Sequence, residues 1–259
     1  MPSGLKPHHF PSLPLIVRQT PSCTNHPCRA IWFSWLGIRT QRNKSLRRRI
    51  AHMRLDFHVH SNLSKDALHS LKHLAVKAKA IGLDGIAVCD HDAMPKDDFK
   101  LEGLLIMRGI ECSAQEGHIS VFGVPPDFDY MKGIPAAEIA RRAERAGGIS
   151  IVNHAFSIRK RNSMGSHAFK VKATAIERFN GSDFIHNLRA WKSIPVGTGG
   201  SDAHSVYELG NAYTLLECEP WEDAVLEAVR KKQFKAVLAQ NPFSILRRKY
   251  ERLMKKRDK

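Results

Sequence analysis

Short apolar runs and longer amphipathic segments alternate along most of this chain. The run Gly85-Ile86-Ala87-Val88-Cys89 has the composition of a buried strand, and 68–81 carries apolar residues at helical spacing before Gly82. We expect strands at 55–60, 85–89, 104–107, 119–124, 149–152, 175–179, 195–198, 213–216 and 235–238, and helices at 68–81, 135–146, 183–192 and 221–232. Short strands that alternate with helices predict a mostly parallel α/β barrel formed by a single domain.

The first 52 residues differ from the rest, because no helical or strand period persists in them. Residues 1–55 contain ten Lys or Arg and no Asp or Glu. We interpret 1–52 as a basic, Pro-rich extension that is disordered or lies upstream of a true start at Met53. A transit peptide and a nucleic-acid-binding arm are the alternatives. The barrel is then expected to span 53–245, followed by a basic C-terminal tail at 246–259.

The net charge of +16 is concentrated near the N-terminus, because the residues after 55 carry 31 basic and 25 acidic side chains. This mild excess suits a phosphate-bearing substrate and does not require nucleic acid. Five scattered cysteines without a C-x-x-C pair favour a reducing, cytoplasmic location. No apolar run is long enough to span a bilayer, so we expect no membrane partner. No obligate protein partner is evident.

Histidines and carboxylates gather where the predicted strands end. His58 and His60 alternate with Val59 in one strand, so both imidazoles point to the same face. The other residues of this kind are Asp66, Asp90, His91, Glu111, His118, His154, Asp202 and His204. The carboxyl ends of parallel strands meet at one rim of a barrel, where active sites lie. Imidazoles and carboxylates that converge there predict a polynuclear metal site.

His118 precedes its predicted strand, whereas the other histidines of this set follow theirs. Only six residues separate it from Glu111, which is too few for a parallel crossover. We therefore expect a hairpin that returns His118 to the rim that carries Glu111. Cys112 lies beside Glu111, but strand alternation turns it to the opposite face, so it is expected to pack rather than to react.

The motifs at these strand ends resemble those of one family. They are His58-Val59-His60, Cys89-Asp90-His91, Gly109-Ile110-Glu111, Gly117-His118, Asn153-His154 and Ser201-Asp202-Ala203-His204. In this order they resemble the motifs of the PHP (polymerase and histidinol phosphatase) domain family, from Met53 to about Pro242. The resemblance implies a distorted (β/α)7 TIM-like barrel, two or three bound divalent ions and phosphoester hydrolysis.

The resemblance also implies roles for the candidate residues. The first metal would be held by His58, His60, Glu111 and Asp202, the second by Glu111, His118 and His154, and the third by Asp66, His91 and His204. Asp90 is expected to orient His91, and Asp90 or His204 to assist proton transfer. Histidine-rich ligand sets suit Mn, Zn or Fe better than Mg, and we favour Mn.

The chemistry implied is attack on phosphorus by a metal-bridging hydroxide. We expect the substrate to be a small phosphorylated metabolite or nucleotide, with an exonuclease on short RNA or DNA as the first alternative. A non-catalytic RNA-binding barrel is a further alternative, which the intact ligand set disfavours. The basic loop Arg159-Lys160-Arg161 is a candidate clamp for a substrate phosphate, with a solvated loop as its alternative.

Overall fold

A computed structural model of the chain describes residues 52–96, 98–158 and 163–257. The strands are β1 His52–Val59, β2 Gly85–His91, β3 Leu105–Ser113, β4 His118–Phe122, β5 Ile149–Val152, β6 Ala175–Asn180, β7 Thr198–Gly200, β8 Ala212–Glu217 and β9 Phe234–Leu238. The helices are α1 Leu71–Ala80, α2 Ala136–Arg145, α3 Phe184–Ser193, α4 Glu222–Arg230 and α5 Pro242–Arg257, with a 3-10 helix at Gly165–Lys170. The expected N-terminal extension lies outside the described residues except for His52, which begins β1.

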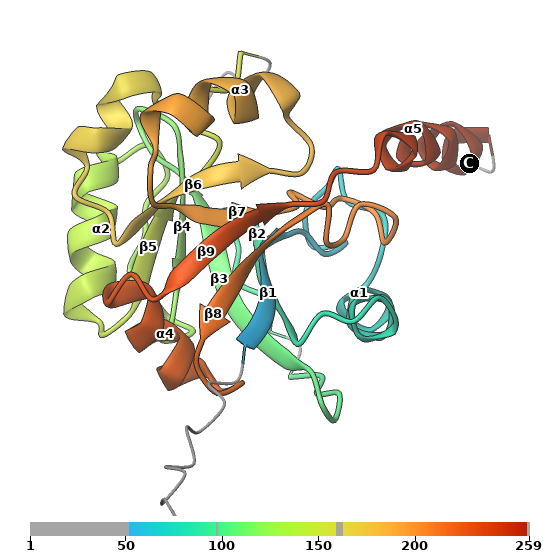
Figure 1. Ribbon diagram of the computed structural model, residues 1–259, viewed down its shortest axis with the longest axis horizontal. Coiled ribbons are helices and arrows are strands. Elements are labelled where there is room, and N and C mark those ends of the chain that lie inside the picture. Colours follow the sequence, from blue (N-terminus) through green and yellow to red (C-terminus); the bar gives the residue numbers. More distant parts are fainter. Residues whose placement is uncertain (1–51, 97, 159–162, 258–259) are drawn as a thin grey trace, which may run out of the picture. The chain divides into compact units, whose positions relative to one another are not determined.

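The strands form one sheet in the order β7-β6-β5-β4-β3-β2-β1-β8-β9, which curls into a nearly closed barrel (Figure 1). The chain beyond β7 returns to β1 at the closing seam. There the backbone N–H of His60 donates to Ala203 O at 2.9 Å, and Ala203 N–H donates to His58 O at 3.2 Å. A Cβ on Gly200 would lie 2.4 Å from His58 Cβ, so this close approach requires glycine. The expected α/β barrel is confirmed.

The hairpin expected between Glu111 and His118 is confirmed. Strands β3 and β4 pair antiparallel, with Glu111 opposite Ser120 and Ser113 opposite His118. The sheet is less parallel than expected, because β1–β8, β3–β4, β4–β5 and β8–β9 are all antiparallel pairs. A short connection explains the β3–β4 pair, since residues 114–117 allow a hairpin but not a crossover.

Three helices cover the sheet through separate apolar clusters. Helix α1 buries Leu71, Leu74, Ala75 and Ala78 against β2, and α2 buries Ala136, Ile139, Ala140 and Ala143 against β4 and β5. Helix α4 contributes Val225, Leu226, Ala228 and Val229 to a third cluster with β1 and β8. These spacings of three and four residues are those of an amphipathic helix, as the sequence pattern predicts.

The C-terminal segment differs from expectation. Of the basic tail expected at 246–259, residues 246–257 belong to helix α5, which begins at Pro242 and continues to Arg257, the last described residue. The proline fits the first turn of a helix, and the Leu, Lys and Arg residues that follow favour helix formation. None of the helices in the described part of the chain is long and apolar enough to cross a membrane.

Candidate metal centre

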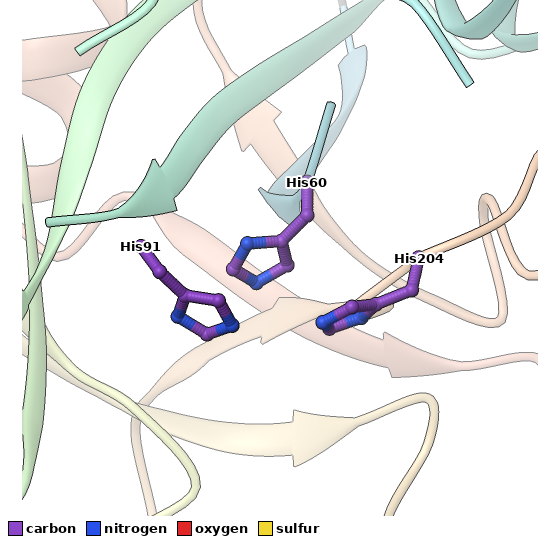
Figure 2. A group of neighbouring side chains, drawn as sticks. All are labelled: His60, His91 and His204. Carbon is purple, nitrogen blue, oxygen red and sulfur yellow. The ribbon is translucent and has the colours of Figure 1, made fainter. Parts of the chain in front are cut away.

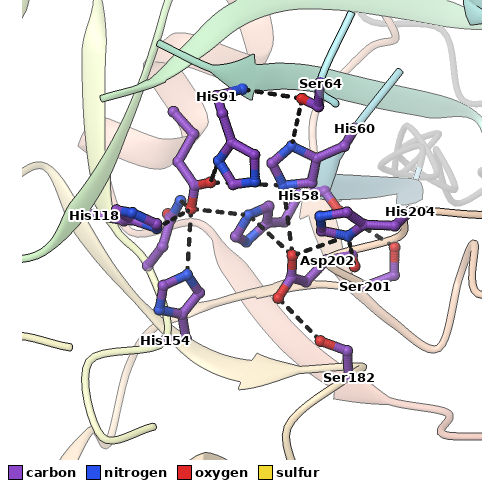
Figure 3. A network of polar contacts seen from close by, with 12 residues as sticks. His58, His60, Ser64, His91, His118, His154, Ser182, Ser201, Asp202 and His204 are labelled. Atoms are coloured by element: carbon purple, nitrogen blue, oxygen red, sulfur yellow. Dashed lines mark hydrogen bonds and ion pairs between the residues drawn. The ribbon is translucent and has the colours of Figure 1, made fainter. Parts of the chain in front are cut away.

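Six strands and the turns beside them, at β1, β2, β3, β4, β5 and β7, deliver the candidate residues to one rim of the barrel (Figure 3). His58 and His60 come from β1 and its end, and their imidazoles are fully buried, with ring centroids 5.1 Å apart. Figure 2 shows the rings of His60, His91 and His204 turned toward one another, with centroids of His60 at 4.4 Å from His91 and 4.3 Å from His204. Ring nitrogens from separate strand ends therefore face a common space.

Glu111 is the centre of the cluster. Its oxygens lie 3.2 Å from His58 Nε2, His118 Nδ1 and His154 Nε2, 2.7 Å from His91 Nδ1 and 3.7 Å from His60 Nε2. Asn153 Nδ2 donates a hydrogen bond of 2.8 Å to the same carboxylate. A single carboxylate with histidine nitrogens on several sides has the arrangement of a ligand that bridges metal ions.

Two aspartates complete the cluster. Asp202 Oδ1 lies 3.6 Å from His58 Nε2, 3.5 Å from His60 Nε2 and 3.6 Å from His204 Nδ1. Asp66 lies farther out, with its side chain half exposed, 3.2 Å from His204 Nε2 and 3.6 Å from His91 Nε2. The cluster is therefore closed at Asp202 and open to solvent at Asp66.

Backbone strain coincides with two of the candidate ligands. His154 and Asp202 adopt positive φ angles of 27° and 55°, which residues with a side chain rarely adopt. Strain of this kind persists where the surrounding structure imposes it, and it is concentrated at functional sites. Both residues directly follow short strands, so the turn that leaves each strand aims the side chain at the cluster.

The electrostatics of the cluster favour a cation. Burial acts to lower the pKa of His58, but the carboxylates of Glu177 and Glu111 hold that pKa well above its usual value. Burial and the neighbouring His204 hold the pKa of His60 well below its usual value. Burial acts to raise the pKa of Glu111, but His118 and His58 hold it well below its usual range. The buried carboxylates of Glu111 and Glu177 are therefore stabilised by a positive charge beside them, which a divalent ion would supply.

Three buried atoms at the centre, His58 Nε2, His60 Nε2 and Glu111 Oε2, lack a hydrogen bond of normal geometry with any residue that the structure describes, and Glu111 Oε2 has only ion-pair contacts, the shortest to His91 Nδ1. Buried polar atoms are almost always paired, so such a group requires an explanation. Their residues form one possible metal-binding triad, and His60, His91 and His204 form another. The remaining triads are His58, His154 and Asp202, and His91, Glu111 and His118. These residues fit divalent metal ions.

Asp90 contacts the turn after β1, and its expected role in orienting His91 stays a prediction. Its carboxylate accepts hydrogen bonds from the backbone N–H and hydroxyl of Ser61, at 2.8 and 2.7 Å, and of Ser64, at 3.1 and 2.6 Å. Ser64 Oγ in turn lies 3.3 Å from His60 Nδ1 and accepts from the backbone N–H of His91 at 3.1 Å. Asp90 therefore fixes the turn after β1, and it reaches the His91 backbone through Ser64.

Two buried acids of the site were not predicted from the sequence. Glu177 of β6 lies with Oε1 3.0 Å from His58 Nδ1, while its Oε2 accepts from the backbone N–H of His154 at 2.6 Å. Asp56 of β1 accepts from the backbone N–H groups of Ser201 at 2.8 Å and Gly210 at 3.0 Å. The available signal in both cases was a carboxylate inside a strand: Asp56 lies between Leu55 and Phe57, and Glu177 follows Ala175 and Ile176.

The remaining candidates divide into two groups. Arg159, Lys160 and Arg161 lie outside the described residues, so their role as a phosphate clamp stays a prediction. Cys112 is fully buried in the apolar cluster under α2, as expected, and burial raises the pKa of its thiol.

Comparison with known proteins supports this geometry. The model of the PHP domain matches residues 56–159, and that of the PHP-associated region matches 185–234, which together cover more than half of the chain. An uncharacterized protein of Methanocaldococcus jannaschii is 26% identical over 180 residues, or 62% of this chain and 69% of that protein.

Solved structures share the fold at low sequence identity. PsfC from Pseudomonas syringae is 18% identical, with a TM-score of 0.63 over 78% of this chain and 98% of its own. The lesion-specific endonuclease PfuEndoQ from Pyrococcus furiosus is 18% identical, with a TM-score of 0.54 over 72% of this chain and 58% of its own. With the motifs in order around a buried ligand cluster, the chain belongs to the PHP domain family and is a hydrolase of phosphoric esters.

Proposed function

We propose that this protein hydrolyses a small phosphorylated metabolite or nucleotide at a centre of two or three divalent ions. The observation that carries the proposal is Glu111, a buried carboxylate contacted by five histidine nitrogens. Such a carboxylate is surrounded by more ligating nitrogen atoms than a single metal ion needs. The proposal assigns His58, His60, Glu111 and Asp202 to the first ion, Glu111, His118 and His154 to the second, and Asp66, His91 and His204 to the third.

Bound divalent ions would lower the pKa of a water molecule and offset the negative charge that develops on the phosphoryl group. The protein fixes the ligands for this chemistry. Glu177 holds the His58 ring and the His154 backbone, and Asp90 holds the turn that carries His60 through Ser64. Locked ligands keep the geometry that the reaction needs.

The open side of the cluster is the proposed entrance for the substrate. Asp66 is half exposed and His91 is about one-third exposed, whereas Glu111 and His60 are fully buried. His204 Nε2 lies 3.2 Å from Asp66 at this open side. We assign to His204 the transfer of a proton to the leaving oxygen, in competition with its role as a ligand. Asp90 is assigned a positioning role, because its carboxylate is occupied by four hydrogen bonds.

Manganese is the metal that we propose, with zinc and iron as alternatives. The candidate set contains six histidines, and imidazole suits these metals better than it suits magnesium. The described cysteines, Cys89, Cys112 and Cys218, are all free thiols, which supports the proposed cytoplasmic location.

An exonuclease acting on short RNA or DNA is the second candidate. The same centre could hydrolyse a diester, and the residues after 55 carry a net excess of basic side chains. One structure with this fold, with a TM-score of 0.50, is an Endonuclease Q bound to a 27-mer duplex with an abasic lesion. That protein is 19% identical, and this chain spans 57% of its length.

The test is phosphate release by Mn-loaded protein from a panel of a phosphomonoester, a nucleoside bisphosphate and a short RNA. We expect release from the monoester or the bisphosphate. His58→Ala should abolish it, and His73→Ala, on the exposed face of α1, should not. Mononucleotides produced from the RNA alone would instead support the exonuclease. Activity that survives His58→Ala would contradict the proposed centre.

A further inference from the structure

Helix α5 follows β9 and projects from the barrel (Figure 1), and its polar side contacts the rest of the structure. The contacts are Asn211 Nδ2 to Ser244 Oγ at 2.7 Å, Arg248 Nη1 to Glu208 Oε1 at 3.0 Å, Ser205 Oγ to Glu251 Oε2 at 2.8 Å, and the Arg247 guanidinium 3.8 Å above the ring of Tyr207. Ser244, Arg248 and Glu251 recur at intervals of four and three residues, so they share one face. This face is fixed by hydrogen bonds and an ion pair.

The opposite face of α5 is apolar and faces away from the protein. Phe243, Leu246, Tyr250 and Leu253 recur at intervals of three, four and three residues, which places them in one stripe. They are 73%, 62%, 62% and 63% exposed, respectively. A surface helix normally turns its apolar stripe inward, so α5 has the reverse orientation. A contiguous exposed apolar stripe marks an interaction surface.

The excess of basic residues in α5 favours a partner that carries negative charge. The helix contains seven basic residues, Arg247, Arg248, Lys249, Arg252, Lys255, Lys256 and Arg257, and a single acid, Glu251. Of the basic residues with described side chains, Arg247 and Lys249 are exposed on the two sides of the stripe. An apolar stripe flanked by basic residues is the pattern of a helix that lies on an anionic membrane surface.

Other occupants fit less well. A second copy would bring two strongly basic helices together, and a helix of 16 residues, about 24 Å long, offers too little area for a stable dimer. Residues 1–51 contain no acid and would repel α5. A planar anionic surface needs only the apolar stripe and its flanking charges.

We infer that α5 is an interfacial helix that binds this protein to an anionic lipid surface. Phe243, Leu246, Tyr250 and Leu253 enter the headgroup region, while Arg247 and Lys249 contact lipid phosphates. The inference departs from the expectation of no membrane partner, which rested on the lack of a spanning segment, because an interfacial helix does not cross the bilayer. It is independent of the hydrolytic centre, since none of these side chains belongs to the ligand cluster.

The experiment is vesicle flotation with the full-length protein. Vesicles contain phosphatidylcholine with or without about 30% phosphatidylserine, to supply the negative surface potential. We expect at least about tenfold more bound protein on the anionic vesicles, and a lower bound fraction at high salt. The variant Leu246→Glu/Leu253→Glu should lose this binding. The control Leu188→Glu/Val196→Glu adds the same charge at exposed apolar positions outside α5 and should retain it.

Hydrolysis of a soluble monoester at the wild-type rate establishes that both variants are folded. If neither wild type nor variants hydrolyse the monoester, that result contradicts the proposed function and leaves the vesicle-binding result unaffected. The inference is overturned if wild-type protein does not float with anionic vesicles, or if Leu246→Glu/Leu253→Glu floats equally well. A solution dimer that this variant lacks, or tight binding to a short RNA in place of vesicles, would also overturn it.

Discussion

Glu177 offers the sharpest test of how the ligands are held, because it contacts two of them at once. One carboxylate oxygen lies 3.0 Å from His58 Nδ1, and the other accepts a 2.6 Å hydrogen bond from the backbone N–H of His154. Asn180 Nδ2 donates to the second oxygen at 3.1 Å. Burial acts to raise the pKa of Glu177, but His58 lowers it to about 2, so the group is a carboxylate at neutral pH.

The substitution Glu177→Gln keeps the shape of the side chain but leaves one carbonyl oxygen in place of two acceptors. Either the His58 ring or the His154 backbone then loses its acceptor in a buried environment. An unpaired buried donor costs about 1–3 kcal/mol. Loss of a group that orients a metal-ligating histidine lowers metal affinity or activity by about 10–100-fold, which corresponds to about 1.4–2.7 kcal/mol. The two values agree in magnitude.

The assay is calorimetric titration of metal-free protein with Mn, together with thermal unfolding. We expect Glu177→Gln to weaken Mn binding by about 10–100-fold and to lower the unfolding free energy by about 1–3 kcal/mol. Glu217→Gln, at an exposed position of β8, is the matched control and should change neither quantity. Wild-type Mn affinity in Glu177→Gln would refute the reasoning that Glu177 positions the ligands.

Three further predictions concern the frame of the site. Arg248→Met removes the ion-pair partner of the fully buried Glu208 and should lower the unfolding free energy by about 3 kcal/mol. If the stability recovers in the double variant Arg248→Met/Glu208→Gln, the buried charge of Glu208 is the cause of the loss. An unchanged denaturation midpoint in Arg248→Met would exclude this cause. Gly109→Ala places a Cβ 2.2 Å from the Val121 carbonyl oxygen and should destabilise the β3–β4 hairpin by about 3 kcal/mol, measured by urea unfolding. An unfolding free energy equal to that of wild type would contradict the close approach of the two strands. Burial raises the pKa of Asp56 from 3.8 to about 6, so its native state binds the proton more tightly than the unfolded state. The stability of wild type relative to Asp56→Asn should therefore fall by about 3 kcal/mol as the pH of metal-free protein rises from about 3 to about 7, and a pH-independent difference would contradict the shift.

The positions of the candidate ligands could be predicted because strand ends and loop lengths are local properties. The short link between Glu111 and His118 excludes a crossover, and the structure contains the hairpin that this implies. Strand alternation likewise predicts that His58 and His60 share a face, and both rings face the cluster. The assignment of each ligand to a particular ion remains a prediction.

The supporting acids could not be predicted in the same way. Glu177 contacts residues 119 and 23 positions away in the chain, so its role depends on how β6 lies relative to β1 and β5. Helix α5 illustrates a second limit. Its apolar stripe is evident in the sequence, but the pattern would place that stripe against the core, and the structure turns it outward. The contacts of Ser244, Arg248 and Glu251 reveal which face docks.

The central claim is that several divalent ions share the carboxylate of Glu111. Anomalous diffraction at the manganese edge from Mn-loaded crystals tests it most directly. The account predicts two or three peaks among the ligand residues, with Glu111 within bonding distance of at least two of them, at about 2.0–2.6 Å. A single peak, or peaks that leave Glu111 uncoordinated, would contradict the account.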